Sequence, residues 1–408
     1  MLTISEAFDR LLATVSPLAA QARPLSESFG LTLAEDVSAS ADSPPFDKVL
    51  MDGFAVRSAD LVDGSASLIV VDVITAGRVP ARPVGVGEAI QIMTGAPLPD
   101  GADVVVKIEE SVQDGNVVRL STRSAAGANI LRRGTSVRTG SVVLRSGMKL
   151  NGARIGALAE LGRTHVLVRR RPTVAVLATG DELVPVDQQP GPGQIRNSNQ
   201  SMLVAQVQAA GAIPVPLGIA RDNRQDLRAK IREGLKYDML ALSGGVSAGI
   251  LDLVPSELAA AGVREVFHKV EMKPGKPVWF GHRIEPGASP DASIVTSNNV
   301  FGLPGNPVSS MVCFELFVRT AIRQLMGESS VLPQLIPAKL EHDYSARADR
   351  PTYHPAQLTW SVDGPTVSLV PWHGSSDLCG TVAANAMAFL SGEARQYQAG
   401  MVLGTICW

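Results

Sequence analysis

The chain contains 408 residues, of which 45% are hydrophobic and 19% charged, and its formal net charge at pH 7 is −2. This length exceeds the roughly 250–300 residues at which a single core stops growing, so we expect several domains. The near-neutral charge supplies no field that would attract nucleic acid or an anionic membrane surface, and we expect neither as a partner.

The first predicted element is an amphipathic helix over residues 3–15. Thr3 can cap this helix, because Glu6 follows it at capping-box spacing, and apolar residues recur along one helical face. From about residue 30 to 145, helical periodicity is nearly absent and short β-type runs alternate with glycine and proline, which favours a separate β-rich domain. A helical pattern returns over residues 152–162. We therefore interpret the β-rich part as an insertion.

Strand and helix patterns alternate from residue 173 to 327. The predicted strands are 173–178, 213–217, 239–242, 263–268, 278–280 and 293–298, and the predicted helices are 201–210, 223–234, 254–261 and 307–326. This alternation indicates a mostly parallel sheet covered by helices on both faces. The last helix has Asn306 as its cap, Pro307 at its first position and Gly327 just beyond its end. Residues 333–408 return to β character.

These elements predict a multidomain fold of the α/β plus β class. Residues 1–28 and 145–172 form a helical linking domain, and a β-rich domain of residues 29–144 is inserted into it. Residues 173–328 form an α/β domain with a mostly parallel sheet, and residues 329–408 form a C-terminal β domain.

Cysteine, histidine and long apolar runs carry little functional signal. The cysteines, Cys313, Cys379 and Cys407, are far apart and odd in number, which argues against a disulfide framework or a zinc site. The six histidines show no paired spacing for a metal site or a Ser-His-Asp triad. Since no apolar run approaches the ~20 residues that span a bilayer, and no leader pattern is present, we expect a cytoplasmic protein.

Five glycine-rich, charge-bearing segments lie within the predicted α/β domain, and three of them directly follow apolar strands. The first is Thr-Gly-Asp-Glu at residues 179–182, and the second is Arg-Asn-Ser-Asn at residues 196–199. We interpret Asp181 as a structural residue that bonds backbone amides, and Glu182 as the carboxylate better placed to contact a ligand. A turn that merely caps the following helix is about equally consistent with this segment.

The segment at residues 243–249, Ser-Gly-Gly-Val-Ser-Ala-Gly, is more specific. Its glycines and serines follow an apolar strand and are expected to leave backbone N–H groups able to meet an oxyanion. The spacing matches neither a Walker A loop nor a dinucleotide fingerprint. Asp252 near the next helix is a candidate ligand of Mg²⁺, with a helix-capping aspartate as the alternative.

Two further loops of the same domain suit a phosphorylated ligand. Lys273 and Lys276 lie on a proline-stiffened turn at residues 273–277, with Lys269 upstream, and such a turn can form a fixed cationic wall. Lysines on a solvated hairpin are the alternative. The loop at residues 303–309, Leu-Pro-Gly-Asn-Pro-Val-Ser, directs the N–H groups of its helix toward the space before it.

In the β-rich region, two segments contain aspartates beside glycines. They are residues 44–56, which include Asp52, and residues 92–103, which include Thr94. By local sequence alone both are ordinary turns, and neither would be chosen as a site.

Taken together, these segments closely resemble the MoeA family of molybdopterin molybdenumtransferases, which includes the E domain of gephyrin. The motifs at residues 44–56, 92–103, 178–183, 243–249, 272–277 and 303–309 occur in that family's order. The resemblance covers essentially the whole chain and implies a molybdopterin-binding type of α/β domain. It also implies an elongated homodimer in which the active site lies between one subunit's α/β domain and its partner's remaining domains. A molybdopterin adenylyltransferase is a candidate partner protein.

The resemblance implies a Mg²⁺-assisted reaction in which adenylylated molybdopterin and molybdate give molybdenum cofactor and AMP. The matching catalytic positions are Asp52, Thr94, Glu182, Asp222 and Asp252, and the implied metal ligands are Asp252 and Glu182. The matching substrate-binding positions are Gly244, Gly245, Ser247, Lys269, Lys273, Lys276, Pro304, Pro307 and Ser375.

The chain departs from the family pattern in two places. Val49-Leu50 stands where the family usually has Ser-Ala, and the segment from Arg350 to Leu358 keeps Arg350 but lacks a later arginine. Two alternative functions remain open at this point. One is adenylyl transfer to molybdopterin, although such enzymes are far shorter and Asp52 and Thr94 would then be idle. The other is a non-catalytic, gephyrin-like scaffold, against which the retained acidic residues argue.

Overall fold

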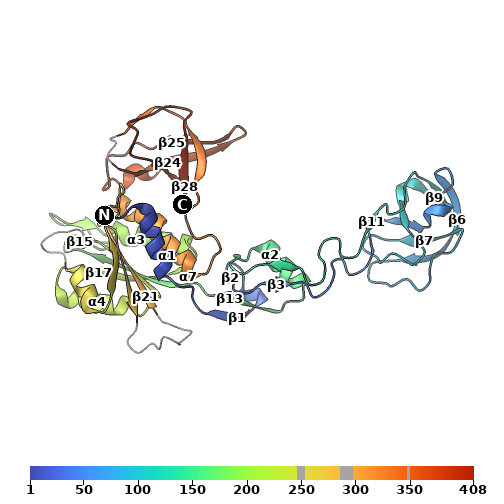
Figure 1. The fold of residues 1–408 in the computed structure, drawn as a ribbon, viewed down its shortest axis with the longest axis horizontal. Coiled ribbons are helices and arrows are strands. Elements are labelled where there is room, and N and C mark those ends of the chain that lie inside the picture. The colour runs from blue at the N-terminus through green and yellow to red at the C-terminus, as the bar shows by residue number, and fades with distance from the viewer. Residues whose placement is uncertain (246–252, 285–296, 347–349) are drawn as a thin grey trace. The chain divides into compact units, whose positions relative to one another are not determined.

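The computed structural model describes residues 1–408 except 246–252, 285–296 and 347–349. The chain folds as two compact units, which we treat separately. The first comprises Met1–Glu35, Ser146–Gly152 and His165–Trp408, and the second comprises Asp36–Arg145 and Ala153–Thr164 (Figure 1). None of the helices in the described part of the chain is long and apolar enough to cross a membrane.

The N-terminal helix α1 (Ile4–Thr14) confirms the predicted capping box. The Thr3 hydroxyl accepts a hydrogen bond from the Glu6 amide at 3.2 Å, and the Glu6 carboxylate accepts one from the Thr3 amide at 2.8 Å. Two orphan N–H groups are thereby satisfied, and the helix can bury Ala7 and Leu11.

The segments on either side of the β-rich unit pair with each other. β1 (Ala20–Pro24) and β2 (Thr32–Leu33) lie on the two sides of β13 (His165–Arg169) in a three-stranded antiparallel sheet. The chain therefore leaves and re-enters the first unit at adjacent strands, as an insertion requires. The four-domain division of the chain stays a prediction.

The first unit contains the expected mostly parallel sheet, in the order β17-β14-β18-β21-β20-β19. Its strands are β14 (Thr173–Thr179), β17 (Ile213–Ala220), β18 (Met239–Ser243), β19 (Arg264–His268), β20 (Trp279–Ile284) and β21 (Ser297–Leu303). The first four strands of that order are parallel, and β20 and β19 complete the sheet antiparallel. A short parallel pair, β15 (Leu183–Val184) and β16 (Ile195–Arg196), lies outside this sheet.

The sequence-based prediction ends one strand, β21, too early in the chain. β21 runs from Ser297 to Leu303, whereas residues 293–298 were predicted, and 293–296 lie outside the described residues. Asn298 and Asn299 look unsuited to a buried strand, but both find partners there. The Asn298 amide donates to the Tyr237 carbonyl at 2.7 Å, and Asn299 Oδ1 lies 3.3 Å from Nδ1 of His282.

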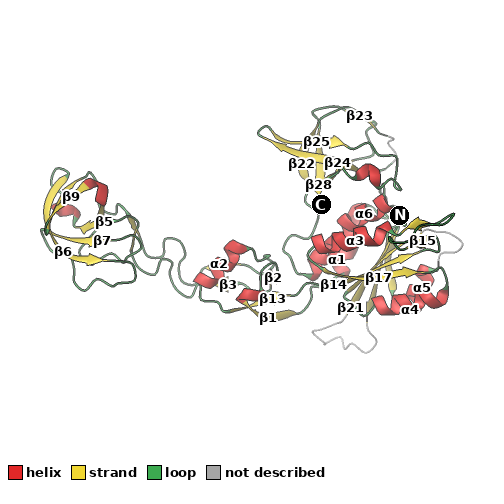
Figure 2. Cartoon of the chain, turned by 180° about the vertical axis from the view of Figure 1, so that it is seen from behind, coloured by secondary structure: helices red, strands yellow, loops and turns green. Residues whose placement is uncertain are grey.

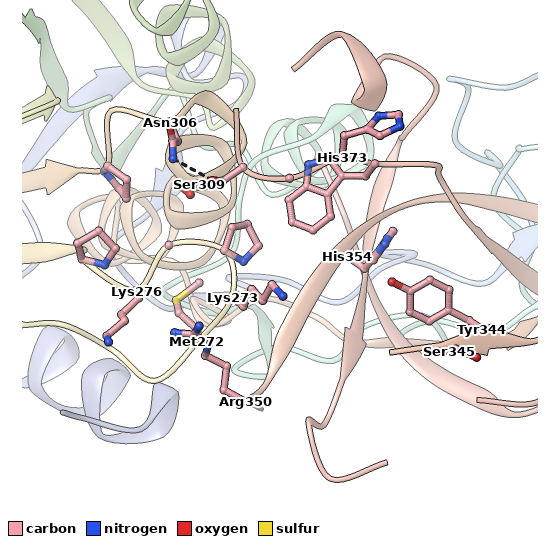
Figure 3. Close-up of a pocket in the computed structure, with 17 residues that line it drawn as sticks. Met272, Lys273, Lys276, Asn306, Ser309, Tyr344, Ser345, Arg350, His354 and His373 are labelled. Atoms are coloured by element: carbon pink, nitrogen blue, oxygen red, sulfur yellow. Dashed lines mark hydrogen bonds between the residues drawn. The ribbon is translucent and has the colours of Figure 1, made fainter. Parts of the chain in front are cut away.

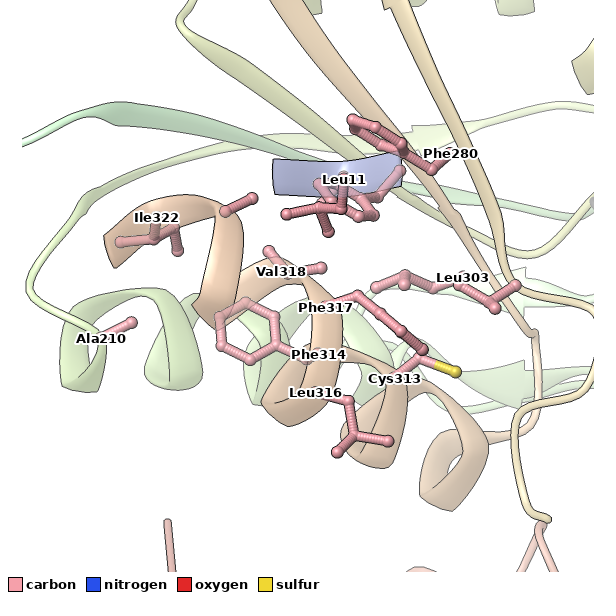
Figure 4. Packing of buried hydrophobic residues seen from close by; sticks show 14 of the residues in the cluster. Leu11, Ala210, Phe280, Leu303, Cys313, Phe314, Leu316, Phe317, Val318 and Ile322 are labelled. Atoms are coloured by element: carbon pink, nitrogen blue, oxygen red, sulfur yellow. The ribbon is translucent and has the colours of Figure 1, made fainter. Parts of the chain in front are cut away.

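Helices cover both faces of the sheet, as predicted (Figure 2). On one face lie α1, α3 (Ser198–Ala209), α6 (Pro307–Cys313) and α7 (Arg319–Leu325), and on the other lie α4 (Arg224–Gly234) and α5 (Val254–Ala260). A π-helical segment, Phe314–Val318, joins α6 to α7. Figure 4 shows Leu11, Val318 and Phe280 packed in the larger core, where Cys313 is also buried as expected.

The C-terminal part of the chain forms a closed β-barrel. Its strands are β22 (Ile336–Leu340), β24 (Thr352–Ser361), β25 (Gly364–Leu369), β26 (Ala386–Leu390) and β28 (Val402–Cys407), with β23 (Tyr344–Ser345) and β27 (Gln396–Tyr397) paired separately. The Lys273 amide donates to the Pro351 carbonyl at 2.9 Å, and the Lys273 carbonyl accepts from the Tyr353 amide at 2.7 Å. The start of β24 is thus hydrogen-bonded to the turn at residues 273–277 of the α/β domain, which we call the lysine turn.

The second unit is built on a six-stranded sheet in the order β8-β5-β7-β6-β10-β9. Its strands are β5 (Gly53–Val56), β6 (Ser65–Ile74), β7 (Glu88–Ile92), β8 (Val104–Lys107), β9 (Ser111–Asp114) and β10 (Val117–Ser121). Smaller elements are β3 (Val37–Ser38), β4 (Lys48–Val49), β11 (Ile130–Leu131), β12 (Val142–Leu144) and α2 (Gly152–Glu160). The predicted β-rich character is confirmed.

Gly53→Ala is expected to lower the free energy of unfolding by about 1–3 kcal/mol, the usual cost of overpacking a tight site. A Cβ on Gly53 would lie 1.9 Å from the Val106 carbonyl oxygen on the neighbouring strand β8, so the strands would have to separate. Denaturant unfolding measures the effect. The matched control is Gly156→Ala in α2, where a Cβ meets nothing within 4 Å. Equal stabilities of the two variants would contradict the prediction.

Candidate functional site

The loops at the carboxyl ends of the four parallel strands meet around one cavity of about 940 Å³ in the first unit. Glu182 follows β14, Asp222 follows β17, Gly244 and Gly245 follow β18, and Pro304 begins the loop after β21. We call this the acidic cavity, because its lining residues include three carboxylates, Glu182, Asp222 and Asp377, against one basic side chain, Arg196. Ligand sites of open α/β sheets lie at this edge, so the placement agrees with the expectation from sequence.

Two aspartates brace the first two of these loops against each other. The Asp181 carboxylate accepts a hydrogen bond from the Asp222 amide at 3.1 Å, and the Asp222 carboxylate accepts one from the Asp181 amide at 3.3 Å. Asp181 is not among the residues lining the cavity, whereas Glu182 is. This arrangement matches the interpretation of Asp181 as structural and of Glu182 as the carboxylate available to a ligand.

The loop after β18 needs its glycines for backbone reasons. Gly244 and Gly245 have φ values of +98° and +67°, and a Cβ on Gly244 would lie 2.7 Å from the Thr179 carbonyl oxygen. The sequence-based expectation of an uncovered N–H group is wrong at Gly244, because its amide donates to the Leu303 carbonyl at 3.0 Å. Ser247 and Asp252 lie outside the described residues.

Asn199 was not assigned a role by sequence reasoning, although the segment containing it was singled out. Its Nδ2 donates to the Ser243 hydroxyl at 2.6 Å and to the Gly305 carbonyl at 2.8 Å. Asn199 therefore ties the start of α3 to the loops after β18 and β21, and it lines the acidic cavity itself. A single amide in a polar segment gives no spacing signal from which this bridge could be inferred.

A second cavity, of about 660 Å³, adjoins the first and shares Pro277, Pro304 and Asn306 with it. It lies between the lysine turn and the barrel, and Figure 3 shows Lys273 and Arg350 among its labelled residues. Lys273, Lys276 and Arg350 line it, and none of its lining residues is a carboxylate. We call it the cationic cavity. Among the described residues, neither lysine has an ion-pair partner, so both ammonium groups are available to an anion.

The lysine turn packs against the hydrophobic core through Gly275, which contacts Cys313 of α6. Gly275 has a φ of +107°, and a Cβ there would lie 2.5 Å from Sγ of Cys313. The Cys313 thiol donates to the Gly275 carbonyl at 3.4 Å, and burial raises the pKa of this thiol, which therefore stays protonated. The alternative of a solvated hairpin is not what the structure contains, because this turn packs on a buried helix.

The loop after β21 joins the two cavities. Pro304 lines both, and Pro307 lines the acidic one. Asn306 occupies the predicted cap position, but its side chain makes no capping bond. Its side-chain Nδ2 donates to the Ser375 hydroxyl at 2.9 Å instead. Ser375 lines the cationic cavity, and its carbonyl accepts from the Val308 amide at 3.0 Å.

Of the substrate-binding assignments that fall on described residues, Lys269 is the one that lines neither cavity. It has a φ of +67°, and its backbone is hydrogen-bonded to Leu2 and Val278. Lys269 is therefore placed at a bend of the chain, and its assignment as a ligand contact has the weakest geometric support.

In the second unit, Asp52 and Thr94 are brought together from loops about 40 residues apart. The Asp52 carboxylate accepts hydrogen bonds from the Thr94 amide and the Thr94 hydroxyl, both at 2.7 Å. These bonds lower the pKa of Asp52 below its ordinary value, and both residues are exposed. The pair is thus a fixed, ionised carboxylate at the surface of this unit.

Thr94→Val is expected to raise the pKa of Asp52 part of the way toward the ordinary value of about 3.9, because the variant loses the hydroxyl but keeps the amide. A depressed pKa in the folded state stabilises the protein above the unfolded pKa, and that contribution is lost as the pH falls through the folded pKa. The variant should therefore lose less stability on acidification. Carboxyl carbon NMR titration measures the shift, and Thr94→Ser, which keeps a hydroxyl, should leave the pKa low.

Comparison with known proteins agrees with this geometry. Residues 2–162 match the model of the MoeA N-terminal region (domains I and II), and residues 175–324 match that of a probable molybdopterin binding domain. A molybdopterin molybdenumtransferase of Staphylococcus epidermidis is 33% identical over 94% of this chain and 90% of the relative. That of Staphylococcus aureus is 34% identical over 99% of this chain and 94% of the relative.

The chain belongs to the molybdopterin molybdenumtransferase family. Family membership makes it an enzyme of the transferase class. The crystal structure of a molybdopterin biosynthesis MoeA protein from Pyrococcus horikoshii has the same fold, with a TM-score of 0.82, 26% identity and full coverage of both chains. A molybdenum cofactor biosynthesis protein from Pyrococcus furiosus, at 17% identity and a TM-score of 0.59, shares the fold.

Proposed function

We propose that this protein transfers molybdenum from molybdate to adenylylated molybdopterin, which forms molybdenum cofactor and releases AMP. The observation that carries the proposal is the division of the site into two adjoining cavities of opposite character. An oxyanion suits the cationic cavity. The larger acidic cavity, lined by the turn at Gly244 and Gly245, suits the pterin substrate. The dithiolene sulfurs that receive molybdenum belong to the pterin, which accounts for a site without clustered cysteines.

The residues of the cationic cavity would bind and orient molybdate. Lys273, Lys276 and Arg350 are three cations with no lining carboxylate beside them, and molybdate is a dianion that takes charge-assisted hydrogen bonds. Ser375, held by Asn306, adds a hydroxyl on the same wall. Because this cavity adjoins the acidic one at Pro304, an oxyanion held here lies beside a substrate bound in the other.

The acidic cavity has ligands that fit Mg²⁺. Glu182 and Asp222 line it, and Mg²⁺ is commonly bound by one or two carboxylates together with phosphate oxygens and water. Within the described ranges no group of three or more metal-binding side chains gathers, so such an ion would depend on its phosphate and water ligands. When bound, Mg²⁺ would neutralise charge on the pyrophosphate. Asp252 remains a proposed further ligand, outside the described residues.

We further propose a homodimer in which the second unit of one subunit serves the first unit of its partner, with Asp52 and Thr94 as the contributed residues. This proposal follows from the family resemblance. It assigns the ordered carboxylate of Asp52 a role in the active site of the partner subunit. A molybdopterin adenylyltransferase, which would supply the adenylylated substrate, is the proposed partner protein.

The test is AMP release from adenylylated molybdopterin by the purified protein with Mg²⁺, in the presence and absence of molybdate. We expect release that depends on molybdate, together with cofactor that reconstitutes a molybdenum enzyme lacking its cofactor. Release of AMP without cofactor formation would reduce the activity to hydrolysis. Absence of release under both conditions, with tight binding of another protein, would favour a scaffold.

A further inference from the structure

His354 is a titratable residue of the cationic cavity that the proposed function does not use. It lies on β24, is 4% exposed and lines the cavity. Its ring packs at steep angles against two aromatic side chains, with centroid distances of 5.2 Å to Tyr344 and 5.4 Å to Trp372. The orientation of the imidazole is therefore fixed by packing.

One ring nitrogen of His354 is committed to the backbone. Nδ1 lies 2.8 Å from the Pro355 carbonyl oxygen, and since a carbonyl only accepts, Nδ1 must carry a hydrogen. In the neutral ring the other nitrogen, Nε2, then has a lone pair and no hydrogen. Nε2 has no hydrogen-bond partner in the described part of the chain, so it is the atom left to meet a ligand.

The surroundings disfavour a charged ring in the absence of an anion. Burial is the largest influence on the pKa of His354 and lowers it; the hydrogen bond to Pro355 opposes this in part, and the nearby charge of Lys273 adds to the lowering. The net direction is downward, so the imidazole is neutral near pH 7. The other titratable groups that line the cavity are Lys276, Arg350, Tyr344 and His373. None of them is a carboxylate that could stabilise an imidazolium. An oxyanion would supply that missing negative charge.

We propose that the cationic cavity binds its oxyanion together with one proton, which His354 Nε2 takes up. This inference rests on the proposed function, because it takes molybdate to be the oxyanion. A lone pair facing an anionic oxygen is repulsive, whereas an imidazolium N–H donates a charge-assisted hydrogen bond to it. Oxyanion binding therefore raises the pKa of His354, and by linkage a lower pH strengthens oxyanion binding.

The sign of the pH dependence follows from this coupling. Above the pKa of His354 in the unliganded protein, each bound oxyanion brings a proton with it, and the affinity falls by up to about tenfold per pH unit. The dependence levels off once the pH exceeds the raised pKa of the complex. We expect the dependence to be present from pH 7 upward, where sulfate is also fully ionised and serves as a second probe.

The experiment is titration calorimetry of the full chain with molybdate and with sulfate, in HEPES and in Tris, whose different ionisation enthalpies report protons taken up. We expect proton uptake approaching one per oxyanion for both probes. His354→Gln should bind without uptake and with an affinity independent of pH. His373→Gln is the matched control, because His373 lines the same cavity but its Nδ1 is paired with Asp377 at 3.1 Å, and it should retain the uptake.

The outcomes separate this inference from the proposed function. Oxyanion binding without proton uptake, or uptake that survives in His354→Gln or disappears in His373→Gln, overturns the role of His354 and leaves the proposed reaction intact. No oxyanion binding by the unaltered protein overturns both. If His354→Gln is unfolded by circular dichroism, NMR titration of the histidine rings in the unaltered protein decides instead. The resonance of His354 must shift to a higher pKa when molybdate is added, and an unchanged pKa rejects the inference.

Discussion

The double substitution Lys273→Ala and Lys276→Ala is expected to lower kcat/KM for molybdate at least about a hundredfold, since a hydrogen bond to a charged group contributes about 1.5–3 kcal/mol. The two lysines stand on a turn packed against Cys313, and the lining residues of their cavity include no carboxylate that would neutralise their charge. Loss of both leaves Arg350 to face a dianion. Molybdate-dependent AMP release at several molybdate concentrations measures the effect.

Lys269→Ala is the matched control for this double variant. Lys269 lies on the same stretch of chain and carries the same charge, but it lines neither cavity. It should therefore keep kcat/KM within about threefold of the unaltered protein, since surface substitutions away from specific contacts have small effects. A large loss in Lys269→Ala with little loss in the double variant would reverse the assignment of the oxyanion site.

Asp52→Asn is expected to reduce cofactor formation by at least about a hundredfold, the usual effect of removing one fixed electrostatic group from an active site. The variant preserves size, and its Oδ1 can still accept from the Thr94 amide and hydroxyl, so the loop should remain folded. What disappears is the charge. The control is Asp114→Asn, an exposed aspartate of the same unit whose ion pair with Arg119 is long, at 3.9 Å.

Mixing subunits tests where Asp52 acts. If one subunit supplies Asp52 to its partner's lysines, mixed dimers of Asp52→Asn with the lysine double variant contain one intact site. Random re-assortment should then restore about a quarter of the original activity, because about half of the dimers are mixed. No recovery after demonstrated subunit exchange would place Asp52 and the lysines in one subunit's site.

Much of the fold could be predicted because the signals were local. The capping pair Thr3 and Glu6, the alternation from β14 to α7, and the closing Gly327 are all patterns within a few residues. The misplaced strand β21 shows the limit of this approach, since Asn298 and Asn299 are stabilised in the sheet by distant partners. Polar residues in a buried strand look unfavourable until those partners are known.

The site was predictable only in part, for the same reason. The carboxyl ends of parallel strands must gather at one edge, so Glu182 and the glycines at 244 and 245 could be grouped from sequence, whereas Asp222 was named only through the family resemblance. In contrast, the hydrogen bonds from Thr94 to Asp52 and from Asn199 to Ser243 join residues more than 40 positions apart. Their local sequences describe turns and a helix start, and only the family resemblance pointed to the first pair.

The hydrogen bonds on both sides of Lys273 have a mechanical consequence. Its backbone amide donates to the Pro351 carbonyl and its backbone carbonyl accepts from the Tyr353 amide, at the start of β24. The position of Lys273 is therefore restrained by the barrel as well as by the α/β domain. A displacement of the barrel would therefore also move the backbone of Lys273 and change the distance between its ammonium group and a bound anion. An α/β domain produced without the barrel would keep Lys273 but lose both of these backbone hydrogen bonds, and with them the restraint on where the ammonium group lies.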